Sequence, residues 1–397
     1  MIPPPRTSAG TQVAIAGTTD FHSALHRAPD LVAALHDARS SSLIVDSGDF
    51  FEGPYYPVTR GATEERILTE LYDVIAPGNH GWTHYTGRLR DLTVCANVID
   101  TSTNSPFFRP LHLTELSGRR VAVTAVIGAD AFASIAPDFR AGQAVTDPAR
   151  ALHQLYEHHH QDVDVWVLLS HQGFGRDRDV AVHCPFLDLI FSGHCHSITT
   201  GPEAVGTTML LKALEFGRGI ATARLYPSGW AAAVEHTAPR PLPAELSWVT
   251  QAVGHADRAL NEAVGRPSSH WRNRIFSPEE LLRGVAARLR RQTGFGVILN
   301  TSAISPHTLG NVLTRRDLID LVPYDNRLLR TDSPAGPCCW PPSAVNGQRG
   351  PVVVEVPTLR VPILTTDYLA QQYAATHPHT TALRQVVLEE LTGGDIQ

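Results

Sequence analysis

The sequence predicts an α/β protein with two domains. Five short apolar runs lie in the first half of the chain, and each is rich in Val, Ile and Leu and bounded by Gly, Asp, Ser or Pro. Such runs are typical of buried strands. A proline-rich break follows at Pro239–Pro243, and a new alternation of helical and strand patterns begins after it. The length of 397 residues also exceeds the usual size of one domain.

Each of the five predicted strands ends at a cluster of polar side chains. The strands are Val13–Ala16, Leu43–Val45, Tyr72–Ala76, Val165–Leu169 and Leu187–Phe191. The clusters are Asp20-x-His22, Gly48-Asp49, Gly78-Asn79-His80, Ser170-His171 and Gly193-His194-Cys195-His196. Side chains just beyond a strand sit at its carboxyl end, where open α/β sheets build their sites. We therefore expect these clusters to converge on one edge of the sheet.

Other elements of the first half are predicted by composition and by helix caps. Arg119–Ile127 is a strongly β-type run, and Asp147-Pro148 is a helix start that leads to about His158. The histidines at 158–160 are interpreted as a solvated helix end, because no matching ligands follow them at a fixed spacing. The first domain is predicted to span residues 1–237.

The second half is predicted to hold a connecting helix and a smaller α/β domain. A helical stretch at about 244–264 lies in the linker, residues 238–265, and the C-terminal domain covers 266–397. Ser277-Pro278-Glu279-Glu280 is the pattern of a capping box, and Gly294 fits the end of that helix. Strands are expected at Val297–Leu299, Val352–Val356 and Val361–Leu364, and a long irregular loop at Thr331–Gly350.

Composition limits the partners and the compartment. A formal charge of −6 argues against a nucleic-acid backbone as partner. No apolar stretch approaches the ~18 residues of a membrane span, and the first residues lack the apolar core of a signal peptide. The cysteines have neither disulfide-framework nor zinc-site spacing; they are Cys95, Cys184, Cys195, Cys338 and Cys339. We expect a cytoplasmic protein with no membrane or nucleic-acid partner.

Together the five clusters supply the Asp, His and Asn side chains needed to hold two divalent ions side by side. Each cluster alone is a weak signal, and Gly193-His194-Cys195-His196 is the strongest, because alternate residues of an extended turn can offer two imidazoles to adjacent metals. All five in one order at strand ends are much more specific. A two-metal site points to metal-assisted hydrolysis of a phosphate ester.

With these motifs, the chain resembles the calcineurin-like metallophosphoesterases, and more closely their two-domain 5′-nucleotidase branch. The family's Asp-x-His, Gly-Asp, Gly-Asn-His, Ser-His and Gly-His-x-His series is matched by the five clusters. Other segments also resemble the family: Tyr72-Asp73, Ala96-Asn97-Val98 and Asp188-Leu189-Ile190 in the first half, and Leu313–Asn326 and Thr366–Ala370 in the second. The resemblance implies a four-layer αββα sandwich as catalytic domain and a smaller C-terminal α/β domain that binds the substrate.

The resemblance also implies a ligand set. One ion is expected at Asp20, His22 and His196, the other at Asn79, His171 and His194. Asp49 is expected to bridge the two. Mixed oxygen and nitrogen ligation suits Mn, Zn, Fe or Co.

The resemblance implies a catalytic role for Asn79 and for His80, which would neutralise the transition state or protonate the leaving oxygen. Nucleotidases of this branch usually continue as Gly-Asn-His-Glu-Phe-Asp, where the Asp orients the catalytic His. Here Gly81-Trp82-Thr83 follows, so that carboxylate is missing. Either Thr83 or a neighbour such as His84 substitutes weakly, or His80 acts less as an acid.

The C-terminal domain departs further from the branch. Ser305 stands where the branch has an arginine that grips the substrate's anionic group, and Gln371–Ala374 replaces a Gly-Gly-Asp-Gly motif. Two aromatic positions that sandwich a nucleobase remain aromatic. Arg272 and Arg274 are candidates to supply the lost positive charge. The expected substrate-binding residues are Asn300, Tyr324, Tyr368, Arg272 and Arg274.

The leading functional prediction is a dimetal phosphohydrolase acting on a 5′-nucleotide or nucleotide-like phosphomonoester, with a small-molecule phosphate ester as its partner. The departures favour an atypical nucleotide, such as one of a nucleoside natural-product pathway. A second reading is a phosphodiesterase on cyclic nucleotides or nucleotide-sugars, which uses the same metals. A third, from another class, is a catalytically weak relative that binds a nucleotide. The complete ligand set argues against this last reading.

Overall fold

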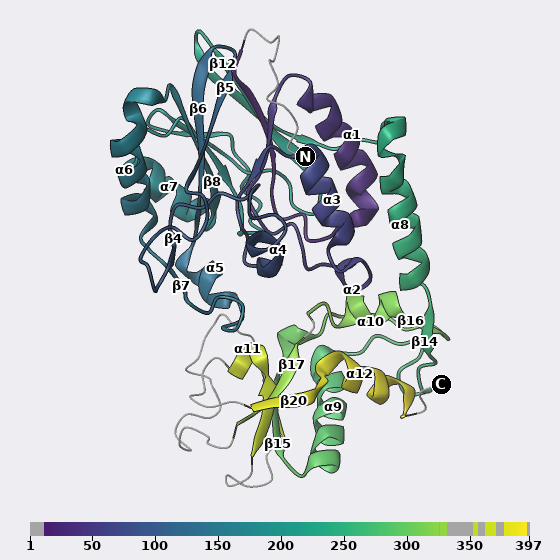
Figure 1. Cartoon of the computed structure of the whole chain (residues 1–397). Helices are drawn as coiled ribbons and strands as arrows, with labels where there is room; N and C mark the ends of the chain where they lie inside the picture. Colours follow the sequence, from purple (N-terminus) through teal and green to yellow (C-terminus); the bar gives the residue numbers. More distant parts are fainter. Residues whose placement is uncertain (1–11, 325, 332–351, 356–361, 371–376, 395–397) are drawn as a thin grey trace. The chain divides into compact units, whose positions relative to one another are not determined.

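The computed structural model describes residues 12–324, 326–331, 352–355, 362–370 and 377–394 (Figure 1). Contacts along the chain divide it into two compact units, Met1–Ala256 and Asp257–Gln397. The boundary falls inside helix α8 (Ser247–Leu260), within the stretch predicted to connect two domains. Each unit has a hydrophobic core of its own.

The first unit is built on two sheets. The five-stranded sheet has the order β13-β12-β1-β2-β3. Its strands are β1 (Ala14–Thr18), β2 (Leu43–Asp46), β3 (Val74–Ile75), β12 (Gly219–Tyr226) and β13 (Gly229–His236). The six-stranded sheet has the order β10-β11-β9-β8-β6-β5. Its strands are β5 (Leu111–Leu116), β6 (Arg119–Ile127), β8 (Val165–His171), β9 (Leu189–Ser192), β10 (Glu203–Val205) and β11 (Thr208–Leu211). A separate ribbon pairs β4 (Val98–Asp100) with β7 (Gln143–Val145).

The strands that carry the polar clusters run parallel to their neighbours. β1, β2 and β3 are parallel in one sheet, as are β6, β8, β9 and β11 in the other. The register places Thr18 opposite Asp46, and Ser170 opposite Ser192. Parallel strands of one sheet end at the same edge, so the clusters gather at one edge of each sheet. The prediction of a single sheet edge was wrong, because three clusters follow the five-stranded sheet and two follow the six-stranded one. The two edges meet where Asp49 contacts His171. All five predicted strands are present.

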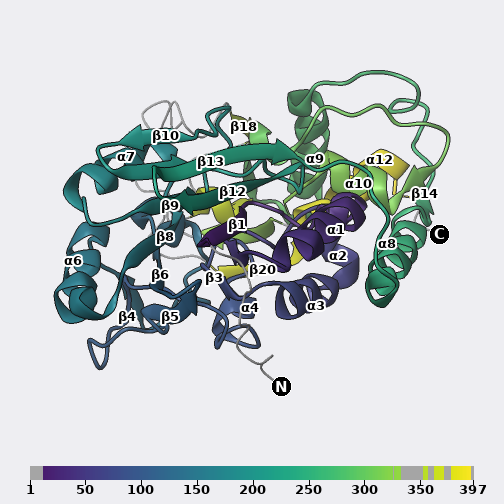
Figure 2. The same cartoon turned by 90° about the horizontal axis from the view of Figure 1, so that it is seen from above.

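The two sheets of the first unit pack face to face, and helices cover their outer faces (Figures 1 and 2). Buried side chains of both sheets, such as Val45 and Val167, form one cluster between them. A second cluster packs the six-stranded sheet against α6 (Pro148–His159) and α7 (Phe174–His183). On the other side lie α1 (Ala28–Arg39) and, against it, α3 (Ala62–Leu71). The predicted αββα sandwich is confirmed.

Short helices occupy the loops of this unit. They are η1 (Leu25–Arg27), α2 (Tyr56–Thr59), α4 (Trp82–Thr86), α5 (Ala129–Ser134) and η2 (His160–Asp162). The predicted start of α6 is confirmed, since the Asp147 side chain accepts a hydrogen bond from the Arg150 backbone N–H at 2.8 Å. The histidines at its end interact within their own helix turn: the rings of His158 and His160 donate to the Gln154 and Tyr156 carbonyl oxygens.

The second unit is a smaller α/β unit around a mixed sheet of order β18-β15-β19-β17-β20. Its strands are β15 (Gly296–Asn300), β17 (Arg327–Thr331), β18 (Val352–Glu355), β19 (Ile363–Thr366) and β20 (His377–Ala382). A separate pair joins β14 (Ala263–Gly265) to β16 (Leu313–Thr314). Its helices are α9 (Pro278–Thr293), η4 (Thr301–Ala303), α10 (Arg315–Leu321), α11 (Asp367–Ala370) and α12 (Leu383–Thr392), while η3 (Ala244–Leu246), directly before α8, still belongs to the first unit. Apolar side chains of α9, α10 and α12 pack with those of β15 and β19.

Two local predictions for the second half were wrong in detail. The predicted helix to about residue 264 ends at Leu260, because Ala263–Gly265 pairs with β16 as strand β14. The predicted capping box of α9 is only half formed: the Ser277 side chain accepts from the Glu280 N–H, but the Glu280 carboxylate pairs with Arg274 instead. A complete box is found at α10, between Thr314 and Asp317.

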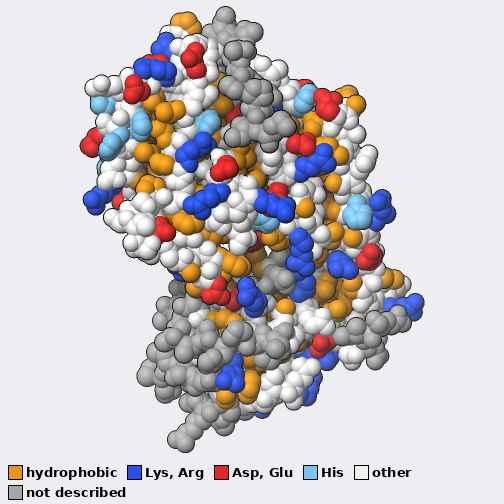
Figure 3. Space-filling view, viewed as in Figure 1, with side chains coloured by type: hydrophobic (Ala, Val, Ile, Leu, Met, Phe, Trp, Pro, Cys, Tyr) orange, Lys and Arg blue, Asp and Glu red, His pale blue; other side chains and the backbone are white. Residues whose placement is uncertain are grey.

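Several predicted features fall outside the described residues. These are the loop at 332–350 with Cys338 and Cys339, the replaced motif Gln371–Ala374, and residues Val356 and Val361 at the ends of two predicted strands. None of the helices in the described parts of the chain has both the length and the apolar character that crossing a bilayer requires. On the face of the first unit drawn in Figure 3, acidic, basic and hydrophobic side chains are interspersed.

Candidate dimetal site

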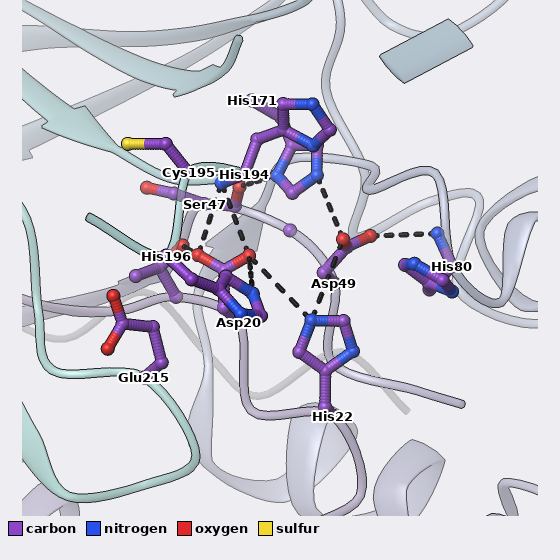
Figure 4. Close-up of polar contacts among 12 residues, drawn as sticks. Asp20, His22, Ser47, Asp49, His80, His171, His194, Cys195, His196 and Glu215 are labelled. Carbon is purple, nitrogen blue, oxygen red and sulfur yellow. Dashed lines mark hydrogen bonds and ion pairs between the residues drawn. The ribbon is translucent and has the colours of Figure 1, made fainter. Parts of the chain in front are cut away.

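Asp49 lies at the centre of the polar clusters, just after β2 (Figure 4). Its Oδ2 atom is 3.1 Å from Nε2 of His171 and 3.8 Å from Nε2 of His22. Its Oδ1 atom accepts a hydrogen bond from the His80 backbone N–H at 2.8 Å. One buried carboxylate thus contacts residues that follow β1 and β3 and the last residue of β8.

A first group of donor atoms is formed by Asp20, His22 and His196, whose ligand atoms lie within 4.8 Å of one another. Oδ1 of Asp20 is 3.9 Å from Nε2 of His22 and 3.6 Å from Nε2 of His196. Both Asp20 oxygens also accept from the His194 backbone N–H. The loops after β1 and β9 are therefore joined at this carboxylate.

A second group is formed by Asp49, His171 and His194, again within 4.8 Å of one another. The side-chain amide of Asn79 lies next to this second group, because its Oδ1 is 3.2 Å from Nε2 of His171. The ring of His171 is fixed from behind: its Nδ1 lies 2.8 Å from the Ser47 carbonyl oxygen. A carbonyl only accepts, so Nδ1 carries the proton and Nε2 is left to bind at the centre.

All seven predicted ligands thus lie together, and the loops that carry them are conformationally strained. Asp20, His22, Asp49 and His194 all have positive φ, between 46° and 74°. Non-glycine residues rarely adopt this region, and such strain gathers at functional sites. A glycine is required next to Asp49, because a Cβ on Gly78 would lie 2.1 Å from both the backbone N and Oδ1 of Asp49.

The electrostatics of the cluster reflect two buried carboxylates among five imidazoles. Burial alone would raise the pKa of Asp49, but His171, His80 and His22 hold it well below its usual range. Burial would lower the pKa of His171, and the Asp49 carboxylate instead raises it to about 9. Burial, with the nearby His171, lowers the pKa of His194 to about 4. Charges of both signs are therefore held here in a small volume.

These residues fit a pair of divalent ions. Nε2 of His22 is buried and has no hydrogen-bond partner among the described residues, although buried polar atoms are nearly always paired. It points to the same centre as the Asp20 and Asp49 carboxylates (Figure 4). Imidazole, carboxylate and amide donors together suit Mn, Fe, Co or Zn.

His80 borders the centre from the far side of Asp49. One of its ring nitrogens lies within 4.8 Å of ligand atoms of His22 and Asp49, and the two imidazole centroids of His22 and His80 are 5.0 Å apart. Burial would lower its pKa, but the carboxylates of Asp49 and Glu52 raise it to about 9. A protonated imidazole at neutral pH therefore adjoins the bridging carboxylate.

Sequence reasoning missed the partner of His80, which is Glu52. Oε2 of Glu52 is 3.0 Å from Nδ1 of the His80 ring, and Oε1 accepts from the Gly81 N–H at 2.7 Å. The expectation for His84 was wrong, because its ring nitrogens lie against Glu65 and Tyr56. The sequence feature that could have indicated this partner is an acidic residue, Glu52, three positions after Asp49.

The predicted substrate-binding residues lie in the second unit. Tyr324 and Tyr368 are exposed, at 56% and 36%, and Arg272 is exposed as well. Asn300 is buried, and its amide is used internally, donating to Ser302 Oγ and accepting from Thr366 Oγ1. Arg274 pairs with Glu280 and lies over the Trp271 ring.

Comparison with known proteins shows what the part of the chain that carries the site is similar to. A family model described as calcineurin-like phosphoesterase matches residues 13–197. The chain is 26% identical over 203 residues to a probable 5′-nucleotidase of Treponema pallidum, covering 48% of this chain and 34% of that protein. It is also 26% identical over 221 residues to the uncharacterized metallophosphoesterase YunD of Bacillus subtilis, covering 50% and 47%. The matches thus span a third to a half of the length of these relatives.

Solved structures share the fold of the whole chain. A putative 5′-nucleotidase from Staphylococcus aureus aligns with a TM-score of 0.72 at 14% identity, over 97% of this chain and 98% of that one. A 5′-nucleotidase precursor from Thermus thermophilus aligns at 0.69 and 18% identity, over 96% of both chains. A sulfate thiohydrolase from the same genus also aligns, at 0.65 and 17%, over 92% and 80%. Residues 13–197 thus match the calcineurin-like phosphoesterase family model, and nearly the whole chain shares the fold of these solved structures.

Proposed function

We propose that this protein is a dimetal phosphohydrolase that releases phosphate from a 5′-nucleotide or nucleotide-like phosphomonoester. The observation that carries the proposal is the position of Asp49. Its carboxylate contacts His22 of one donor group and His171 of the other. A carboxylate shared in this way is what a two-ion centre requires, since it offsets the repulsion between neighbouring cations.

We assign Asp20, His22 and His196 to one ion, and Asn79, His171 and His194 to the other, with Asp49 bridging. A bound pair of divalent ions supplies Lewis acidity and a nucleophile that is active at neutral pH. The chain's own contribution is to hold the donor atoms in place. Asp20 and Asp49 are buried and ionised, and the Ser47 carbonyl orients the ring of His171.

We assign His80 to the leaving group. Its raised pKa keeps a proton on the ring at neutral pH, and the ring is only partly buried, with 29% of the side chain exposed. The Glu52 carboxylate accepts at Nδ1, so the proton on Nε2 is the one available to a substrate oxygen. His80 therefore either protonates the leaving oxygen or stabilises its negative charge.

The nucleotide-like substrate is supported by the second unit and by the named relatives. Tyr324 and Tyr368 are exposed aromatic side chains, suited to stacking on a base. Arg272 is an exposed cation and is our candidate to bind the anionic group of the substrate. Arg274 and Asn300, by contrast, already have partners within the unit. The free cysteines among the described residues agree with a cytoplasmic location, which is also part of the proposal.

One experiment tests the proposal. The purified protein is analysed for bound metals and then assayed for phosphate release from 5′-nucleotides, sugar phosphates, cyclic nucleotides, nucleotide-sugars and p-nitrophenyl phosphate. We expect two metals per chain and the highest kcat/KM on a base-bearing monoester. Preference for a diester would replace the proposal by a phosphodiesterase. Two bound metals without hydrolysis, together with tight nucleotide binding, would indicate a binding protein instead.

A further inference from the structure

Lys212 is the only lysine of the chain, and its side chain is fully buried. It lies directly after β11, in the segment that leads to β12. Its Nζ donates to the Ser197 backbone carbonyl at 3.0 Å and pairs with the Glu215 carboxylate. Ser197 is the residue after the metal ligand His196. A buried cation therefore holds the chain at the point where one ligand loop ends.

The same segment contacts the first donor group from two other directions. The Phe216 backbone N–H donates to the Asp20 carbonyl at 2.8 Å. The Phe216 ring lies 5.3 Å from the ring of His196 and 5.7 Å from that of His22. Phe216 reaches this position with φ of 58°, a strained value for a non-glycine residue. Residues 212–218 thus support Asp20, His22 and His196 together.

This group is supported by a charge network in which Lys212 and Glu215 are buried and Arg218 is partly exposed. The second oxygen of Glu215 accepts from Arg218 at 2.7 Å, so one carboxylate joins Lys212 to Arg218. The Glu215 side chain is 6% exposed and that of Lys212 is 0% exposed. Taking such charges out of water is costly, and a buried ion pair often stabilises a fold no more than apolar residues of similar size would. A role in orienting the ligand loop accounts for a lysine at this place.

The second donor group has different supports. Gly193, ahead of His194, donates its N–H to the Ser170 carbonyl at 2.7 Å, and His171 is held by the Ser47 carbonyl. Beyond His194, Cys195 Sγ accepts from the Phe174 N–H at 3.2 Å and lies 3.5 Å from Ser197 Oγ. His196 therefore depends on the contact at Ser197 more than His194 does.

We propose that Lys212, held by Glu215, is a positioning residue for His196 and sets the affinity of the metal position formed by Asp20, His22 and His196. The inference rests on the dimetal centre of the proposed function. Partners that orient metal ligands typically change metal affinity by roughly ten- to a hundredfold. The effect falls on one of the two metal positions, and the position of Asn79, His171 and His194 keeps its affinity.

The test is a calorimetric titration of chelator-treated full-length protein with Mn²⁺. The variants are Lys212→Met and the double variant Lys212→Met/Glu215→Gln, which avoids leaving a buried carboxylate with one partner fewer. His196→Ala and His171→Ala identify the two positions. Arg178→Met is the matched control. Arg178, on α7, also pairs with a glutamate, Glu203 on β10, but this pair is not among the contacts of the metal-ligand loops.

We expect wild type and Arg178→Met to bind two Mn²⁺ ions. Both Lys212 variants should weaken one site roughly ten- to a hundredfold, the site that is lost in His196→Ala, and leave the other unchanged. Two sites of wild-type affinity in the variants would overturn the inference. Equal weakening of both sites, with a lower melting temperature in the chelator-treated state, would also overturn it, because the lysine would then be merely structural. A wild type that binds no Mn²⁺ would instead remove the proposed dimetal function.

Discussion

The carboxylate of Asp49 lies between two imidazoles that belong to different donor groups. Asp49→Asn removes its negative charge while keeping its shape. We expect this variant to lose bound metal and turnover together, because the charge that offsets the repulsion between the cations is gone. Metal analysis and kcat on the best substrate of the panel check this result. Two metals per chain with near-normal turnover would show that the ligand assignment is wrong.

His80 is held in place by Glu52, a residue of the loop after β2 that lies 28 positions earlier in the chain. His80→Ala should lower kcat by roughly 10²–10⁴ with metal content intact. The loss should be smaller on p-nitrophenyl phosphate, whose leaving oxygen needs little protonation. Equal losses on all esters would make His80 an electrostatic stabiliser instead of an acid.

The dependence of His80 on Glu52 can be measured separately with a double-mutant cycle. Glu52→Gln keeps an acceptor for the Gly81 N–H but removes the charge beside the His80 ring. It should lower kcat in the wild type and have no further effect in His80→Ala. Glu115→Gln, a change at an exposed glutamate on β5, is the control. Additive losses of Glu52→Gln and His80→Ala would mean that Glu52 does not act through His80.

At the scale of elements, α7 is tied to the end of β8 by the buried carboxyl of Asp177. Its Oδ1 accepts from Ser170 Oγ at 2.6 Å and from Gln172 Nε2 at 3.0 Å. Burial raises its pKa from the ordinary 3.8 to about 6. Since the folded-state pKa is the higher one, this group's contribution to stability is complete below pH 3.8 and is lost as the pH rises through about 6.

Asp177→Asn removes this titration. The free energy of unfolding of the variant, relative to wild type, should therefore rise between pH 4 and 8, by on the order of 3 kcal/mol at about 1.4 kcal/mol per pKa unit. Chemical denaturation at several pH values measures it. A difference that is independent of pH would show that Asp177 is ionised in the folded protein throughout this range.

At the scale of the whole molecule, the function proposed for the second unit rests on two exposed tyrosines. If Tyr324 and Tyr368 stack on a base, each ring contributes roughly 1–3 kcal/mol. Tyr324→Ala or Tyr368→Ala should then raise KM for the nucleotide substrate about tenfold, the equivalent of roughly 1.4 kcal/mol. Substitution by Phe should have little effect. An alanine variant that treats base-bearing and base-free esters alike would remove the nucleotide assignment.

Much of the candidate site follows from the order of local patterns along the chain. Apolar runs of strand length can be recognised locally, and polar residues near their ends lie at strand ends, so Asp20, Asp49 and His171 could be expected to meet, although they belong to two sheets and not to one. The caps of α6 and α9 were readable for the same reason, because a cap involves residues three positions apart. The end of α8 was not, since it is decided by the pairing of β14 with β16, which begins 50 residues later.

The sequence by itself indicated the candidate ligands and the class of chemistry, because motif order and strand pattern are local properties, and the αββα layers followed from the resemblance that these motifs carry. Only the tertiary structure decided how the ligands are supported. Glu52 reaches His80 across 28 positions, and Ser47 reaches His171 across 124. Lys212 is a single lysine at the end of a strand, and its role becomes visible only when its Nζ is found buried against Ser197 and Glu215. Such contacts depend on how loops from different strands are packed together, which no local pattern encodes.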